Sequence, residues 1–112
     1  MTEGIKTIVV PVSDLAASKA FYTELLGVQP AHDQPYYVGF EVAGQHFGLN
    51  PNGDVSAGTV YYWHVSDLEA RRDALVAAGA TVIQDATPVG GGRVVATLKD
   101  ADGHTVGLAQ DA

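Results

Sequence analysis

The sequence predicts an α+β fold made of two strand–helix–three-strand (βαβββ) modules, whose curled mixed sheets surround a cavity. Three landmarks recur in the same order in the two halves of the 112-residue chain, as expected of a repeated structural unit. The landmarks are Val-Ser-Asp-Leu at 12–15 and 65–68, a glycine at 27 and 79, and the glycine-bounded segments 44–49 and 103–108. They divide a single domain, residues 1–112, into a first module at about 1–52 and a second module at about 59–112.

A strand followed by a helix is predicted at the start of each module. The strands, at 5–10 and 59–65, are rich in β-branched and aromatic residues. Ser13-Asp14 and Ser66-Asp67 then offer side-chain oxygens that can cap the first free backbone amides of a helix. Apolar residues at helical spacing follow, and in each module a glycine stands where the helix should end in a left-handed turn.

A short strand and a β-hairpin are predicted to complete each module. The hairpins pair 36–42 with 45–50 and 93–99 with 104–109. In the first hairpin, a two-residue Ala-Gly turn fixes which residues face each other across the strands, and cross-strand partners share a face of the sheet. The expected pairs are Val42 with Gln45, Glu41 with His46, Phe40 with Phe47, Gly39 with Gly48 and Val38 with Leu49.

Each hairpin therefore has one apolar face for a helix and one open face. The apolar residues are Val38, Phe40, Val42, Phe47 and Leu49 in the first hairpin, and Val94, Ala96, Leu98, Val106 and Leu108 in the second. The open faces include Tyr37, Gly39, Glu41, His46 and Gly48, and then Arg93, Thr97, Lys99 and Gly107. A mixture of polar and small residues suits a concave binding surface better than a packed core.

The charge balance and the residue types exclude several classes of function. Thirteen acidic and six scattered basic residues give a net charge of −7, so no nucleic-acid partner is expected. The chain has no cysteine, which excludes disulfides, thiolate nucleophiles and cysteine-ligated metal sites. No apolar segment is long enough to span a bilayer and no secretory signal is visible, so a cytoplasmic location without a membrane partner is expected.

The sequence resembles the vicinal oxygen chelate superfamily, the group that contains glyoxalase I, bleomycin-resistance proteins and extradiol dioxygenases. The resemblance covers nearly the whole chain. It rests on residues 12–15 leading to Phe-Tyr-Thr-Glu-Leu-Leu-Gly at 21–27, and on Lys-Asp-Ala-Asp-Gly-His-Thr-Val-Gly-Leu at 99–108. It implies paired βαβββ modules and a homodimer. It specifies the chemistry weakly, because one fold can host several unrelated activities.

The resemblance also implies where a divalent metal would be held. Enzymes of the superfamily bind the metal through His, Glu or similar residues on the first and last strands of each module. The corresponding positions here are Thr7, Gly48, Tyr61 and Gly107. Divalent metals need several nitrogen or oxygen ligands, which these four residues do not supply. We therefore expect no metal and no other cofactor, and the sequence favours a binding protein over an enzyme without deciding between them.

Seven residues are candidates for ligand binding on the open strand faces: Thr7, Tyr37, Glu41, His46, Tyr61, Trp63 and Arg93. Aromatic rings with glycines 39, 48 and 107 beside them leave room for a flat ligand that stacks, although the same rings are as well explained by filling the cavity. The favoured function is metal-free binding of a small molecule, with an aromatic or cationic compound sequestered in the manner of bleomycin-resistance proteins.

The alternative function is a lyase, isomerase or dioxygenase of the same superfamily. Such an enzyme would be metal-dependent with unusual ligands, or it would use Glu41 and His46 for acid–base catalysis. These two residues face each other in the predicted hairpin, so they are also well placed to form a plain hydrogen-bonded pair in a polar pocket.

Overall fold

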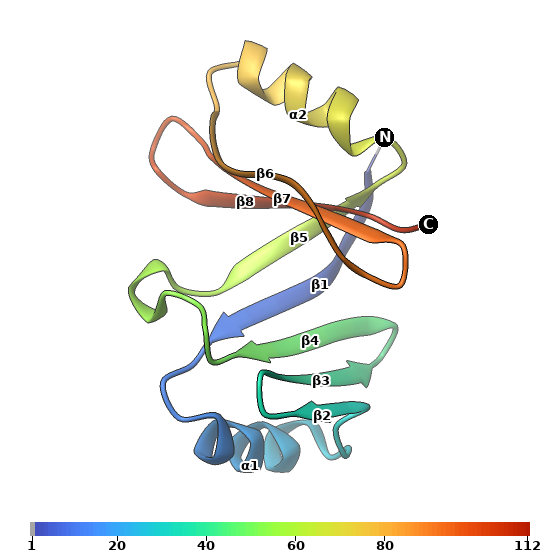
Figure 1. The fold of residues 1–112 in the computed structure, drawn as a ribbon, viewed down its shortest axis with the longest axis vertical. Helices are drawn as coiled ribbons and strands as arrows, with labels where there is room; N and C mark the ends of the chain where they lie inside the picture. The colour runs from blue at the N-terminus through green and yellow to red at the C-terminus, as the bar shows by residue number, and fades with distance from the viewer. Residues whose placement is uncertain (1) are drawn as a thin grey trace. The chain divides into compact units, whose positions relative to one another are not determined.

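The structure, a computed structural model, describes residues 2–112 and confirms the α+β class, with the βαβββ order occurring twice (Figure 1). The first module contains β1 (Thr2–Pro11), α1 (Leu15–Leu26), β2 (His32–Gln34), β3 (Tyr37–Val42) and β4 (Gln45–Asn50). After the short 3-10 helix η1 (Val55–Ala57), the second contains β5 (Val60–Val65), α2 (Leu68–Ala77), β6 (Thr81–Gly90), β7 (Arg93–Lys99) and β8 (Thr105–Gln110). No helix within residues 2–112 is long and apolar enough to cross a membrane.

The chain forms two compact units, and the first consists of residues 7–60. Its strands are hydrogen-bonded in the order β2-β3-β4-β1, with β1 parallel to β4 and the other pairs antiparallel. The predicted pairing of β3 with β4 is confirmed at every position. Their apolar face packs against α1, and Phe40 and Leu49 are fully buried there. Burial of an apolar side chain of this size stabilises the fold by about 1.5–3 kcal/mol.

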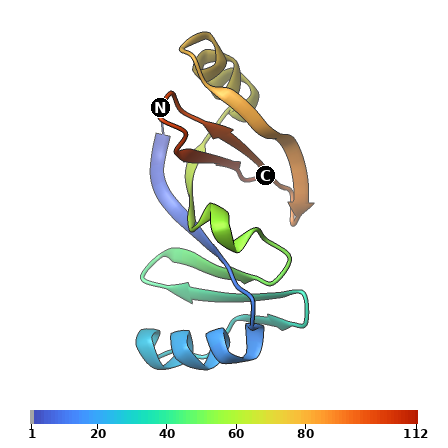
Figure 2. The ribbon, with the colours of Figure 1, turned by 90° about the vertical axis from the view of Figure 1, so that its left-hand side faces the viewer.

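The second unit consists of residues 61–112 and the first residues of β1. Its strands are ordered β1-β5-β8-β7-β6, and the Thr2 hydroxyl donates a hydrogen bond to the His64 carbonyl at 3.1 Å. Leu68 and Leu75 of α2 pack on Leu98 and other apolar residues of the strands. In Figure 2 the long strand β6 (orange) continues from the end of α2.

The predicted starts of the helices and the first hairpin turn are confirmed. The Asp14 carboxylate accepts a hydrogen bond from the Ala17 amide at 3.0 Å, and Asp67 caps α2 in the same way. Ala43 and Gly44 both have positive φ, 52° and 77°. Positive φ at both central residues gives a tight turn whose twist matches that of the two strands, which holds Glu41 and His46 side by side.

The faces of β5 differ from the prediction by one residue. Tyr62 pairs with Gly107 in the parallel β5–β8 pair, and paired residues point to the same face. Strand residues alternate between faces, so the burial of Val65 in the α2 core also places Trp63 and Tyr61 on the α2 side. There their side chains remain 39% and 49% exposed. The prediction that Tyr61 and Trp63 share the open face with Gly107 is therefore wrong.

Candidate functional site

Polar and aromatic side chains gather on the face of the first unit that α1 does not cover. We call this surface the first glycine face and define it by the residues that strand pairing places on one side: Thr7, Val9, Tyr37, Gly39, Glu41, His46 and Gly48. The buried Thr7 pairs with His46 in β4, and His46 pairs with Glu41 in β3. Three strands thus bring four of the seven candidate residues, Thr7, Tyr37, Glu41 and His46, to one surface.

Tyr37, His46 and Glu41 form a continuous chain of hydrogen bonds. Nδ1 of His46 contacts the Glu41 carboxylate, and Nε2 of His46 lies 2.6 Å from the Tyr37 hydroxyl oxygen. An ionised carboxylate only accepts, so a neutral His46 carries its hydrogen on Nδ1, and the Tyr37 hydroxyl donates to Nε2. The side chain of His46 is 15% exposed and that of Glu41 is 55% exposed. The predicted pair is therefore present, and Tyr37 is a third member that the sequence did not reveal.

The glycines of this face make room for aromatic rings of the same unit. A Cβ atom at Gly48 would lie 1.8 Å from the Tyr37 hydroxyl oxygen. A Cβ atom at Gly39 would lie 2.8 Å from Cε1 of His46, 3.1 Å from Tyr37 and 3.3 Å from His32. The shortest distance at each glycine, 1.8 Å at Gly48 and 2.8 Å at Gly39, is far shorter than van der Waals contact. Of the two alternatives that the sequence left open, open space and tight packing, the structure shows tight packing at Gly39 and Gly48, where Tyr37, His46 and His32 fill the space.

The second unit has an equivalent surface. This second glycine face is defined by the residues that strand pairing places beside Gly107: Tyr62, His64, Arg93, Val95, Thr97, Gly107 and Ala109. A Cβ atom at Gly107 would lie 2.7 Å from Cδ2 of Tyr62 and 2.8 Å from the carbonyl oxygen of Tyr61. Burial raises the pKa of the Tyr62 phenol, because phenolate is costlier to desolvate than phenol. The space beside Gly107 is thus also filled by a tyrosine.

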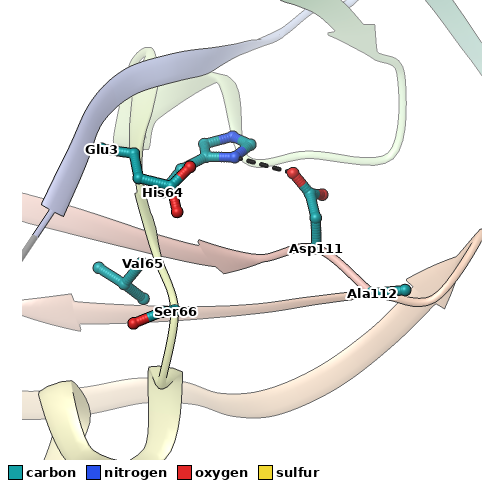
Figure 3. A pocket seen from close by; sticks show the side chains of 6 residues that line it. All are labelled: Glu3, His64, Val65, Ser66, Asp111 and Ala112. Atoms are coloured by element: carbon teal, nitrogen blue, oxygen red, sulfur yellow. Dashed lines mark hydrogen bonds and ion pairs between the residues drawn. The ribbon is translucent and has the colours of Figure 1, made fainter.

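His64, Arg93 and Asp111 meet at one end of the second glycine face. Nδ1 of the buried His64 lies 3.2 Å from one Asp111 oxygen, and Nε of Arg93 donates to the other at 2.6 Å. Figure 3 shows the imidazole and the carboxylate turned toward each other. They border a hollow of about 330 Å³ that is lined by Glu3, His64, Val65, Ser66, Asp111 and Ala112. Asp111 stands beyond the end of β8, so strand periodicity gave no signal for it.

Asp111 should make stability depend on acid pH. The hydrogen bond from Arg93, and to a lesser degree His64, holds the pKa of the Asp111 carboxyl below its ordinary value of 3.8. A lowered pKa means that the stabilisation is complete above the unfolded-state pKa and is lost as pH falls through the folded-state pKa. The free energy of unfolding, measured in urea between neutral pH and about pH 3, should therefore fall less steeply with decreasing pH in Asp111→Asn than in the wild type. The exposed turn variant Asp102→Asn should keep the wild-type slope; equal slopes for all three proteins would contradict the assignment.

The residues at the family's metal positions do not fit a divalent ion. Thr7 offers one hydroxyl, while Gly48 and Gly107 offer no side-chain donor. The structure places Tyr62 rather than Tyr61 on the face of Gly107, and its ring covers that glycine. Across residues 2–112, no three His, Cys, Asp or Glu side chains are grouped so that they could hold a metal ion. The donor set that hard or borderline divalent metals require is thus missing at these positions.

This chain is similar to known proteins along nearly its whole length. The family model of the Glyoxalase/Bleomycin resistance protein/Dioxygenase superfamily matches residues 4–108. A probable lactoylglutathione lyase of Vibrio parahaemolyticus serotype O3:K6 is 32% identical over 124 aligned residues, which cover 89% of this chain and 85% of the relative.

Two solved structures illustrate the likeness in fold. Methylmalonyl-CoA epimerase from Mycobacterium tuberculosis has a TM-score of 0.78 at 18% identity, with 99% of this chain and 89% of that chain covered. The Mn(II)-bound glyoxalase from Novosphingobium aromaticivorans has a TM-score of 0.75 at 20% identity, with 98% of this chain and 39% of that chain covered. At such identities the likeness establishes the fold and leaves the chemistry to the residues of the site.

Proposed function

Because the chain belongs to the glyoxalase/bleomycin resistance protein/dioxygenase superfamily, we propose that it binds a small organic molecule on its first glycine face without a divalent metal. One observation carries the proposal. At Gly48 and at Gly107, where the family would place metal ligands, this chain has no side chain, and a tyrosine fills the space in each unit. A histidine or glutamate at either position would have to displace that tyrosine.

The groups on the first glycine face support binding of an organic ligand. Ligand sites commonly combine aromatic surface with a few polar groups that fix the orientation of the ligand. Here the Tyr37 and His46 rings are nearly parallel, with an interplanar angle of 8°, and the Glu41 carboxylate stands beside them. Tyr61 and Trp63 do not provide aromatic surface for a ligand on an open face, because they lie on the α2 side of the sheet.

Metal analysis combined with a ligand titration tests the proposal. Protein dialysed against Mn²⁺, Ni²⁺ or Zn²⁺ should retain less than stoichiometric metal. Backbone amide NMR should then detect fragments that shift the signals of Tyr37, His46 and Gly48 by the same amount with and without chelator. Stoichiometric metal, together with ligand-induced shifts that chelator abolishes, would overturn the proposal. The absence of any fragment that shifts this face would do the same.

A second candidate function is supported by the Glu41–His46 contact. A carboxylate on Nδ1 makes Nε2 the basic atom of an imidazole, and in this chain Nε2 is in contact with the Tyr37 hydroxyl, so a proton would move between substrate and imidazole through that hydroxyl. The relatives named above include a probable lyase and an epimerase, so the alternative function is an isomerase or lyase that acts without metal. Recovery of the bound compound unchanged from D₂O favours binding. Deuterium incorporation that His46→Asn abolishes favours catalysis.

A further inference from the structure

The first glycine face carries one carboxylate, Glu41, which is oriented by a neighbouring side chain and open to solvent. Glu41 lies on this face beside His46, whose Nδ1 contacts the carboxylate; the neutral tautomer with its hydrogen on Nδ1 donates to Glu41 without adding a charge. More than half of the Glu41 side chain remains exposed, so a ligand on the face can reach the carboxylate. A carboxylate that is both oriented and accessible is a strong acceptor for a charged donor.

The net charge of the surrounding unit also favours a positively charged ligand. Residues 7–60, all of which the structure describes, contain five acidic side chains and a single basic one, giving a net charge of −4. The basic residue, Lys19, is paired with Asp33. A positive ligand approaching Glu41 therefore meets a negative field and no competing free cation from this unit.

The position of Glu41 is fixed by the rest of the hydrogen-bond chain. In the neutral tautomer with the His46 hydrogen on Nδ1, Tyr37 donates to His46 and His46 donates to Glu41, so the chain runs in one direction toward the carboxylate. Each step holds the next side chain in place and lowers the entropy that Glu41 would lose on binding. His46 and Tyr37 are thus positioning residues for Glu41.

We propose that Glu41 anchors a cationic nitrogen group of the ligand, such as an ammonium or amidinium, with its carboxylate oriented by His46 and Tyr37. The proposal rests on the proposed function, because it names the ligand class for the same face. A cationic nitrogen donates charge-assisted hydrogen bonds to the carboxylate, and a flat amidinium also lies well against the adjacent rings.

Benzamidine and benzamide test the proposal, because they share a shape and differ in charge. Backbone amide NMR titration should show benzamidinium binding the first glycine face about tenfold more tightly than benzamide. Glu41→Gln should abolish this preference. The matched variant Glu24→Gln removes the same charge from exposed α1 of the same unit and should retain the preference. Tyr37→Phe should reduce the preference for benzamidinium, because it removes the hydroxyl group that contacts His46 and helps to hold the imidazole in place.

The outcomes separate the two proposals. Equal binding of the two probes, or an equal loss of preference in Glu24→Gln and Glu41→Gln, overturns the cation anchor and leaves ligand binding on this face intact. If neither probe shifts the face while neutral fragments do, the anchor is also overturned. If no compound of any charge shifts it, the proposed function itself fails.

Discussion

Gly107→Ala is expected to lower the free energy of unfolding by about 3 kcal/mol, because the packing around Gly107 leaves no space for the added methyl group. It would lie 2.7 Å from the Tyr62 ring and 2.8 Å from the carbonyl oxygen of Tyr61. The carbonyl belongs to the neighbouring strand β5, so relief requires the strands to separate. Chemical unfolding monitored by circular dichroism measures the loss.

Gly48→Ala is the matched comparison for this prediction. The three atoms nearest to its methyl group all belong to the outer end of the Tyr37 side chain, which can move away at the expense of the hydrogen bond to His46. We expect a loss of about 1 kcal/mol, largely removed in a Tyr37→Ala background. A Tyr62→Ala background should not remove the cost of Gly107→Ala, because the Tyr61 carbonyl remains. Equal costs at both glycines, or full rescue of Gly107→Ala by Tyr62→Ala, would contradict the β5–β8 register.

Phe40→Ala should be the most destabilising truncation on the first hairpin, with a loss of about 3–5 kcal/mol. The Phe40 side chain is fully buried in the core beneath α1, and its loss leaves a cavity that the surrounding residues only partly close. The adjacent variant Glu41→Ala removes an exposed side chain from the opposite face and should cost less than about 1 kcal/mol. The two free energies of unfolding therefore report which face of β3 is the core. A larger loss in Glu41→Ala than in Phe40→Ala would mean that the faces are reversed.

Most of the fold could be predicted because several independent signals agree. The Ala43-Gly44 turn leaves one register for the first hairpin, and the alternation of apolar residues selects the same register. The aspartate caps and the repeated landmarks then fix where each helix begins. The homodimer, the cytoplasmic location and the single-domain organisation remain predictions.

The error in β5 arose where the strand is apolar or aromatic on both faces. Alternation cannot choose between Tyr61 and Tyr62 in such a strand. The repeat held the missing information: an offset of 53 residues equates Val9 with Tyr62, and Val9 pairs with Gly48 just as Tyr62 pairs with Gly107. That offset places Tyr62, rather than Tyr61, on the face of Gly107.

The filling of the glycine gaps could not be predicted, because it depends on the direction of long side chains. Tyr37 reaches over Gly39 to Gly48, a distance along the sheet that sequence spacing does not encode. The same applies to Asp111, whose contact with His64 and Arg93 forms beyond the last strand residue. The sequence pattern predicts the faces of the hairpin strands, and side-chain packing determines which groups occupy them.

Proton–proton NOEs between tyrosine rings and glycine Hα atoms test most directly whether tyrosines occupy the places of metal ligands. The account predicts strong NOEs from the Tyr37 ring to Gly48 Hα and from the Tyr62 ring to Gly107 Hα, with both glycine signals displaced by ring currents. An NOE from the Tyr61 ring to Gly107 Hα, or unshifted Gly48 and Gly107 signals without any tyrosine contact, would contradict it.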